Sequence, residues 1–391
     1  MCGIVGYVGY DEAAGKIIEG LKKLEYRGYD SSGIAILSDK GIELNKCKGE
    51  IKNLENMIAG RIPSGTCGIG HTRWATHGAP SDVNSHPHMD QSGRVALVHN
   101  GIVENYVELK EALINEHGIK FKSETDSEVI AQLVGVKYNA NGGDLEKAVY
   151  DATKEMRGTY AIGVIAEDTP DKIVAYRKEA PLIAGLGKKS NFIASDIPAL
   201  LKYTNDIFLI ENDEMVICTP DSITIKDKDG KEVKREAMKI TWSVEDAEKG
   251  GYEHFMLKEI NEQPKVVAET LNRRIDEDGK IKLDGINLTK EELDNYNKIY
   301  IVACGTAYHA GLVGKYVIEK MAGIAVEVDV ASEFRYRDPF IDEKTLFIAI
   351  SQSGETLDTL MSLRLAKEKG ARVLSVVNVV GSSIARESDD V

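Results

Sequence analysis

The feature that most constrains the fold of this chain is an alternation of strand-like and helical patterns between residues 298 and 377. Strands are expected over 298–303, 325–330, 345–350 and 372–377, and helices over 307–320 and 357–369. When a helix connects each strand to the next, the strands form a parallel sheet with right-handed crossovers. Ligands of such sheets bind at the carboxyl ends of the strands. This part of the chain is therefore expected to be an α/β domain with its site at that edge.

Two short loops that carry hydroxyl groups follow strands of this sheet. They are residues 304–307 (Cys-Gly-Thr-Ala) and 351–356 (Ser-Gln-Ser-Gly-Glu-Thr). Each loop leads into a helix, whose free N–H groups and dipole suit a phosphate. Each hydroxyl taken singly is explained equally well as a helix cap. The chain has neither a Walker A lysine nor a GxGxxG motif, which disfavours a nucleotide. Three hydroxyls within six residues favour a phosphate site.

Short strands dominate residues 159–226. Six are expected, at 159–166, 172–176, 191–194, 208–210, 215–218 and 222–226. Many short strands with helices outside them indicate two stacked sheets in an α+β layered domain. The polar, acidic stretch 242–251 is interpreted as a linker, and the helix that follows it is expected to end at Pro264.

The chain begins Met1-Cys2-Gly3, and removal of Met1 would leave a thiol and a free α-amine on one residue. A thiol with a pKa near ~8.5 is mostly protonated at neutral pH, and an α-amine with a pKa of roughly 7.7–8.0 can accept its proton. N-terminal threonine uses the same pairing of nucleophile and base. A cysteine after the initiating methionine means little by itself, so the motif needs support from the rest of the chain.

Residues 71–99 contain five of the eight histidines, namely His71, His77, His86, His88 and His99. A metal site is one hypothesis, but only His86 and His88 are closely spaced, and neither a cysteine pair nor an HExxH helix accompanies them. The second hypothesis is a recognition loop for a small polar ligand. In that loop Arg73 offers a planar fork to a carboxylate, Thr76 a hydroxyl and Trp74 an apolar lid. The shortage of ligands favours the second hypothesis, and no metal is expected.

An expected strand over 94–98 leads to Asn100-Gly101. Asn-Gly is the commonest hairpin turn signal, and taken alone that is the better interpretation. The alternative is an oxyanion hole, with the Asn100 side-chain amide and the Gly101 N–H as donors. Further on, residues 125–128 form a capping box that places Asp126 in the first turn of a helix. Stabilisation by the helix dipole explains Asp126 there, and so does binding of an ammonium group.

Six segments occur in the order seen in class II glutamine amidotransferases: 2–6, 25–33, 71–80, 84–88, 99–101 and 123–126. The N-terminal half therefore resembles this family, whose members are N-terminal-nucleophile hydrolases with an αββα core. The resemblance implies that Cys2 is the nucleophile and that Asn100 and Gly101 form the oxyanion hole. It also implies a glutamine site beside the Trp74 lid, made of Arg73, Thr76, His77, Gly101 and Asp126. Arg73 would bind the α-carboxylate and Asp126 the α-ammonium.

The C-terminal half resembles a sugar isomerase (SIS) domain, most clearly at residues 351–356. Together the two halves resemble the glutamine–fructose-6-phosphate aminotransferases, also called glucosamine-6-phosphate synthases. This implies that glutamine and fructose-6-phosphate are the substrates, with no cofactor. The phosphosugar contacts implied by the resemblance are Thr306, Ser351, Gln352, Ser353 and Thr356. Ala307 stands where some members have serine, which puts one contact in doubt.

The expected fold is an α+β N-terminal-nucleophile (αββα) glutaminase domain at 2–240, a linker with lead-in helices at 241–290 and an α/β SIS-type parallel-sheet domain at 291–391. The family has a second SIS domain and a C-terminal tail, so the first SIS domain is expected to be incomplete at Val391. If 391 residues are the whole protein, it is expected to hydrolyse glutamine or bind sugar phosphate but not to make glucosamine-6-phosphate alone. A homodimer is expected by analogy with other SIS proteins.

Composition limits the other partners and the compartment. The chain has 49 basic and 63 acidic residues, a formal net charge of −14 and no basic run, so neither nucleic acid nor an anionic membrane is expected to bind. No apolar run approaches the ~18–20 residues of a spanning helix, and the N-terminus lacks a signal-peptide pattern. Five scattered cysteines without a CxxC pair indicate a reduced, cytoplasmic chain.

Two other functions stay open on the sequence alone. One is a different class II amidotransferase, such as a phosphoribosyl-transferring or asparagine-forming enzyme, which residues 351–356 argue against. The other is a non-catalytic sugar-phosphate sensor with an idle glutaminase-like domain, which a retained Met1 would favour.

Overall fold

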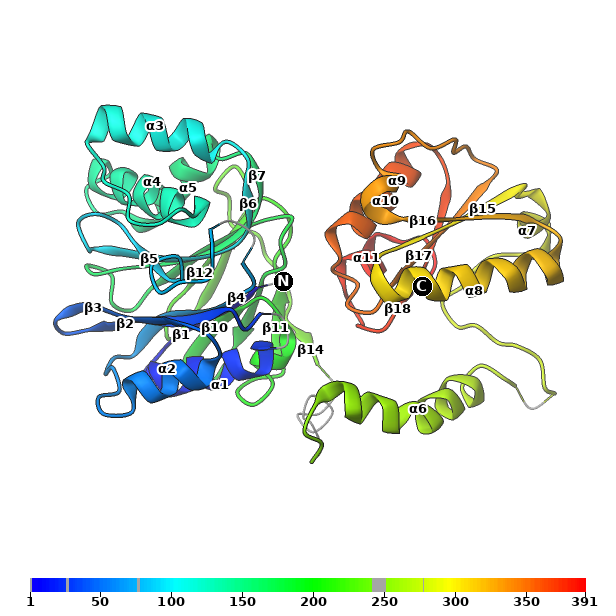
Figure 1. The fold of residues 1–391 in the computed structure, drawn as a ribbon, viewed down its shortest axis with the longest axis horizontal. Helices are drawn as coiled ribbons and strands as arrows, with labels where there is room; N and C mark the ends of the chain where they lie inside the picture. Colours follow the sequence, from blue (N-terminus) through cyan, green and yellow to red (C-terminus); the bar gives the residue numbers. More distant parts are fainter. Residues whose placement is uncertain (1, 26–27, 76–77, 241–250, 277) are drawn as a thin grey trace. The chain divides into compact units, whose positions relative to one another are not determined.

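Two sheets stack face to face in the first part of the chain, and a separate parallel sheet forms in the last part (Figure 1). The computed structural model describes residues 2–25, 28–75, 78–240, 251–276 and 278–391. The chain divides into two compact units, Met1–Gly250 and Gly251–Val391. No helix among these described residues is long and apolar enough to cross a membrane.

The first unit is layered in the order helix, sheet, sheet, helix (Figure 1). Its eight-stranded sheet has the order β14-β11-β9-β10-β1-β4-β2-β3. The strands are β1 (Gly3–Gly9), β2 (Ser31–Ser38), β3 (Gly41–Lys48), β4 (Cys67–Arg73), β9 (Ile183–Leu186), β10 (Ser190–Ala194), β11 (Asp206–Leu209) and β14 (Met238–Lys239). The helices α1 (Ala13–Leu24) and α2 (Ile51–Ile58) cover its outer face, and the short 3₁₀ helix η2 (Ile197–Ala199) packs against α1.

The six-stranded sheet of the same unit has the order β13-β12-β8-β7-β6-β5. Its strands are β5 (His88–Met89), β6 (Val95–Val103), β7 (Gly158–Ala166), β8 (Ile173–Lys178), β12 (Glu214–Cys218) and β13 (Ile223–Lys226). The helices α3 (Tyr106–His117), α4 (Asp126–Ala140) and α5 (Leu145–Glu155) lie over its outer face (Figure 1). The expected αββα layering is therefore confirmed.

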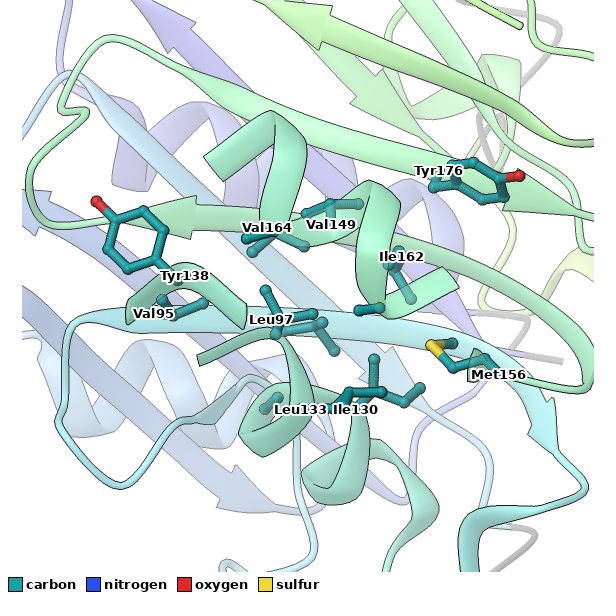
Figure 2. Close-up of a cluster of buried hydrophobic side chains, with 14 of the residues drawn as sticks. Val95, Leu97, Ile130, Leu133, Tyr138, Val149, Met156, Ile162, Val164 and Tyr176 are labelled. Carbon is teal, nitrogen blue, oxygen red and sulfur yellow. The ribbon is translucent and has the colours of Figure 1, made fainter. Parts of the chain in front are cut away.

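Alternation of side chains along the strands explains this layering, because successive residues point to opposite faces of a sheet. In β6, Val95 and Leu97 point outward to α4 and α5, whereas Ala96 and Val98 join the core between the two sheets. Figure 2 shows the outer cluster, where Leu97 and Ile162 meet Ile130 of α4. The first unit has three such clusters, one between the two sheets and one between each sheet and its helices. Burying one such side chain stabilises the fold by about 1.5–3 kcal/mol, so these clusters hold the layers together.

The second unit contains a four-stranded parallel sheet in the order β16-β15-β17-β18. Its elements are α6 (Phe255–Asn272), α7 (Lys290–Asn295), β15 (Lys298–Ala303), α8 (Gly305–Ala322), β16 (Ala325–Val330), α9 (Ala331–Phe334), β17 (Thr345–Ser351), α10 (Leu357–Glu368), β18 (Arg372–Val377) and α11 (Ser383–Glu387). Helix α8 covers one face of the sheet, and α9, α10 and α11 cover the other (Figure 1). The parallel sheet expected from the strand–helix alternation is confirmed.

Three local expectations are wrong. β6 runs through Asn100-Gly101 without a turn, because it stays paired with β7 from Val95 to Val103. β4 extends to Arg73, so the recognition loop starts later than expected. Helix α6 continues through Pro264 to Asn272. Its side chains around the proline are exposed, so water can hydrate the carbonyl that the proline leaves without a donor.

Candidate active site

The candidate site lies where the two sheets of the first unit meet at one end. Cys2 directly precedes β1, and β1 pairs with β4 so that Gly3 lies opposite Thr72. This register brings Cys2 beside the end of β4, where the Trp74 N–H donates to the Cys2 Sγ over 3.2 Å. The Ile4 N–H donates to the Ser195 hydroxyl at 3.0 Å, which ties the start of β1 to the end of β10. The strand thus fixes the backbone that carries the thiol.

Burial raises the pKa of the Cys2 thiol, although the Trp74 amide and the Arg73 guanidinium oppose that effect. A raised pKa keeps the thiol protonated at neutral pH. Since the thiolate is the nucleophilic form, chemistry at Cys2 requires a base close to the sulfur. The α-amine of a processed N-terminus is a base on the same residue.

Asn100 and Gly101 approach Cys2 from β6 in the other sheet. The Asn100 Nδ2 donates to the Cys2 carbonyl over 3.2 Å. Gly101 has a φ of +119°, and a Cβ on it would lie 2.0 Å from the Thr159 carbonyl oxygen. Only glycine fits this backbone conformation beside β7. Of the two interpretations of Asn-Gly, the hairpin is excluded, and the Asn100 amide lies beside Cys2 as the alternative requires.

Arg73 lies near the thiol and Asp126 lies near Arg73, and both are buried, with 4% and 5% of their surfaces exposed. The Arg73 Nη2 donates to the Gly78 carbonyl at 3.1 Å. Burial lowers the pKa of Arg73, and the charges of Cys2, Asp30 and Asp126 oppose that effect. A cation therefore lies within electrostatic range of the sulfur, and the Asp126 carboxylate lies within electrostatic range of that cation, so both signs of charge that would bind the two ends of an amino acid are present.

The helix start that carries Asp126 differs from a standard capping box. The Thr125 hydroxyl accepts from the Glu128 N–H at 3.3 Å, as expected. The Glu128 carboxylate instead reaches the N–H groups of Lys122 and Ser123. Asp126 does not cap the helix either, because its carboxylate accepts from the Val103 N–H of β6 at 3.0 Å. This bond holds the Asp126 carboxylate against the strand that carries Asn100.

The aromatic part of the recognition loop is accessible. Trp74 is 45% exposed, and its ring meets Tyr29 edge-on, with centroids 5.6 Å apart and an interplanar angle of 89°. Thr76 and His77, the remaining expected members of this loop, lie outside the described residues.

Four histidines from the expected cluster lie together behind Cys2, and all are buried: His71, His86, His88 and His99. Burial lowers the pKa of His71 to about 3, and it lowers those of His86 and His88 well below the ordinary value. Among the residues that the structure describes, no group of three His, Cys, Asp or Glu side chains is arranged to hold a metal. The imidazoles of His71, His86 and His88 are therefore neutral, and those of His71 and His99 bond to oxygen atoms.

In the second unit, β15 and β17 are neighbours, so the loops that follow them lie at one edge of the sheet. Ser351 is buried, and its hydroxyl accepts from the Gly354 N–H at 3.0 Å and lies 3.2 Å from the Thr356 hydroxyl. The Ser353 hydroxyl accepts from the Glu355 N–H at 3.2 Å. Gln352 and Thr306 are exposed. The structure thus places four of the expected phosphosugar residues at the end of β17 and on the loop after it, and the fifth, Thr306, in the first turn of α8 after the neighbouring strand β15.

Sequence reasoning missed the segment that supports the longer of these loops. The Ile384 N–H donates to the Gly354 carbonyl at 3.0 Å, and the Ser383 N–H donates to the Glu355 carboxylate at 2.8 Å. A Cβ on Gly354 would lie 1.9 Å from the Ser382 Oγ, so only glycine fits there. The signal for this contact is weak, because Ser382 and Ser383 look like an ordinary helix start.

Comparisons with known proteins match both units. Residues 71–202 match the family model described as a glutamine amidotransferase domain, and residues 292–391 match the one described as an SIS domain. The chain is 59% identical over 391 residues to the glutamine–fructose-6-phosphate aminotransferase (isomerizing) of Clostridium tetani and 50% identical over 392 residues to that of Thermus thermophilus. Each alignment covers all of this chain but only 64% and 63% of the relative.

Solved structures show the same fold at low sequence identity. The glutamine phosphoribosylpyrophosphate amidotransferase of B. subtilis superposes with a TM-score of 0.53 at 18% identity, covering 96% of this chain and 81% of that one. The N-terminal-nucleophile fold class of the first unit is confirmed. The chain thus carries a glutamine amidotransferase domain followed by an SIS domain, and over its whole length it is homologous to the glutamine–fructose-6-phosphate aminotransferases.

Proposed function

We propose that the first unit hydrolyses glutamine at Cys2 and that the ammonia is destined for fructose-6-phosphate bound at the SIS unit. The observation that carries this proposal is the convergence of two donors on Cys2: the Trp74 N–H bonds its Sγ at 3.2 Å, and the Asn100 amide bonds its carbonyl at 3.2 Å. The names of the relatives support both substrates.

Each covalent step of the proposed hydrolysis has a group available for it. After removal of Met1, the α-amine of Cys2 takes the thiol proton, and the thiolate attacks the side-chain amide carbon of glutamine. The carbon–nitrogen bond breaks, the proton passes to the leaving nitrogen as ammonia departs, and a γ-glutamyl thioester remains. Water then cleaves the carbon–sulfur bond and releases glutamate. Asn100 and Gly101 would supply donors to the oxyanion, and one such donor is typically worth about 2.7–4 kcal/mol in the transition state.

The charged ends of glutamine would be held by groups that lie close to Cys2. Arg73 is proposed to bind the α-carboxylate and Asp126 the α-ammonium, with Trp74 as an apolar lid. Thr76 and His77 are assigned to this site by the family resemblance. Because Arg73 and Asp126 are almost fully buried, their contacts with the ligand are shielded from water and are stronger than surface contacts.

For the second substrate, we assign the phosphate to the loops after β15 and β17. Ser351, Ser353, Thr356 and Thr306 offer hydroxyls there and Gln352 an amide, in line with the SIS resemblance. Helix α10 begins at this loop, so its first N–H groups add to the anion site. A homodimer is part of this proposal, and sedimentation equilibrium measures it.

The test is glutaminase activity with and without fructose-6-phosphate, combined with intact mass. We expect glutamate release in wild type, a mass that lacks Met1, and loss of activity in Cys2→Ala. Cys47→Ala is the matched control, because Cys47 is a buried cysteine of β3. Activity that survives Cys2→Ala would refute the proposal. A retained Met1 with sugar-phosphate binding and no glutaminase activity would favour the sensor instead.

A further inference from the structure

We propose that His71 is a positioning residue that sets the orientation of the Asn100 amide toward Cys2. This inference rests on the proposed glutaminase function and adds to it a residue that does not touch the substrate. His71 lies in β4, and Asn100 lies in β6 of the other sheet. Their contact therefore crosses the layer between the two sheets.

The hydrogen bonds of His71 determine its tautomer. Its Nε2 lies 3.0 Å from the His99 carbonyl oxygen and 2.9 Å from the Asn100 Oδ1. A backbone carbonyl oxygen can only accept a hydrogen bond, so Nε2 must carry the proton. The ring is neutral, since burial lowers its pKa to about 3. Nδ1 therefore has no proton.

This tautomer selects one of the two orientations of the Asn100 amide. With Oδ1 toward His71, the NH₂ group is turned to the Cys2 carbonyl, to which it donates at 3.2 Å. In the flipped orientation the NH₂ would face the N–H of His71 and Oδ1 would face the Cys2 carbonyl, so the Asn100 amide would lose both of these hydrogen bonds, whereas the His71 N–H would keep the His99 carbonyl. Each such loss costs about 1–3 kcal/mol. Without His71, the Asn100 amide would lose this preference and its donor would be aimed less precisely.

Neighbouring rings and strands restrict the position of His71. In β4 it pairs with Ile4 on one side and Gly33 on the other. Its ring stacks on His86, with centroids 4.1 Å apart and an interplanar angle of 14°. His86 Nδ1 in turn accepts from the His99 N–H at 3.3 Å. His71 therefore has a fixed place from which to direct Asn100.

Two variants of matched chemistry separate positioning from simple packing. The amide nitrogen of Gln in His71→Gln reaches roughly the place of Nε2, whereas that of Asn in His71→Asn reaches only the place of Nδ1. We expect His71→Asn to lower kcat for glutamine hydrolysis by about 100- to 1000-fold, as for loss of an oxyanion donor, with KM unchanged within about threefold. The kcat of His71→Gln should be at least about tenfold higher than that of His71→Asn. His117→Gln, an exposed position at the end of α3, is the control.

A double-mutant cycle tests whether His71 acts through Asn100. Adding His71→Asn to Asn100→Ala should lower kcat by less than about threefold. Equal activity of the Gln and Asn variants, or additive losses in the cycle, would overturn the proposal. The wild-type chain gives an independent test that needs no variant to fold, because ¹⁵N chemical shifts report the His71 tautomer. A proton on Nδ1 would refute the inference, whereas activity in Cys2→Ala would refute only the glutaminase proposal.

Discussion

Lowering the pH from 7.5 to 5 should strongly destabilise the first unit, because its buried histidines are neutral. His71, His86 and His88 all have pKa values far below 6.5, owing mainly to burial. In the unfolded chain the same side chains are protonated below pH ~6.5. The unfolded state therefore binds more protons than the native state between pH 6.5 and 3. The free energy of unfolding consequently falls as the pH falls through that window.

The size of the effect follows from the two pKa values of His71. With a native pKa of about 3 and an unfolded pKa of ~6.5, His71 loses about 2 kcal/mol of stabilisation between pH 7.5 and 5. Protonation of His86 and His88 in the unfolded state adds losses of the same sign, and the whole stability of many domains is only about 5–15 kcal/mol. Most paired carboxylates titrate at a lower pH, so the histidines dominate this interval.

Urea unfolding followed by tryptophan fluorescence measures this loss. The chain has two tryptophans, Trp74 and Trp242, and Trp74 is packed beside Tyr29 in the first unit, where its fluorescence reports unfolding. His88→Gln should reduce the loss between pH 7.5 and 5, whereas His117→Gln, which removes an exposed ring, should leave it unchanged. A free energy of unfolding at pH 5 within about 1 kcal/mol of that at pH 7.5 would contradict a neutral, buried cluster.

Two other substitutions test single contacts. Gly101→Ala should lower glutaminase kcat at least about 100-fold, because its Cβ would clash with the Thr159 carbonyl at 2.0 Å and displace the Gly101 N–H. Ile102→Ala, at an exposed neighbouring position, is the control. A kcat of Gly101→Ala equal to that of wild type would contradict the oxyanion role. Lys46 donates to the carbonyls of Val83 at 3.1 Å and Ser85 at 2.6 Å, and burial lowers its pKa to about 8. The unfolded state then holds more protons than the native state above pH 8, so the stability of wild type relative to Lys46→Met should rise by about 1–2 kcal/mol between pH 7 and 9.5. Urea unfolding at the two pH values measures this change, and the control Lys48→Met on the same strand should show none. A stability difference between wild type and Lys46→Met that stays constant with pH would contradict the buried amine.

Strong periodic patterns allowed the parallel strands of the second unit to be predicted almost residue by residue. The strands expected over 298–303, 325–330 and 372–377 have those bounds in the structure. A parallel strand is covered on both faces, so its apolar run is nearly continuous and its ends are visible in the sequence. The Asn100-Gly101 signal failed for the opposite reason. Its turn preference is local, and pairing of β6 with β7 along nine residues overrides it.

The histidine cluster shows why a site can be located from sequence while its chemistry stays ambiguous. Five imidazoles within 29 residues are compatible with a metal, a ligand loop or a packed interior. The deciding facts are which atoms face each nitrogen and how much water is excluded, and both depend on strands distant in sequence. His71 meets Asn100 across 29 positions, through two different sheets. Because its Nε2 faces only oxygen atoms, the ring must act as a donor, and a metal would need that nitrogen lone pair free. The same bonds that exclude a metal ligand at Nε2 therefore turn the Asn100 amide toward the carbonyl of Cys2.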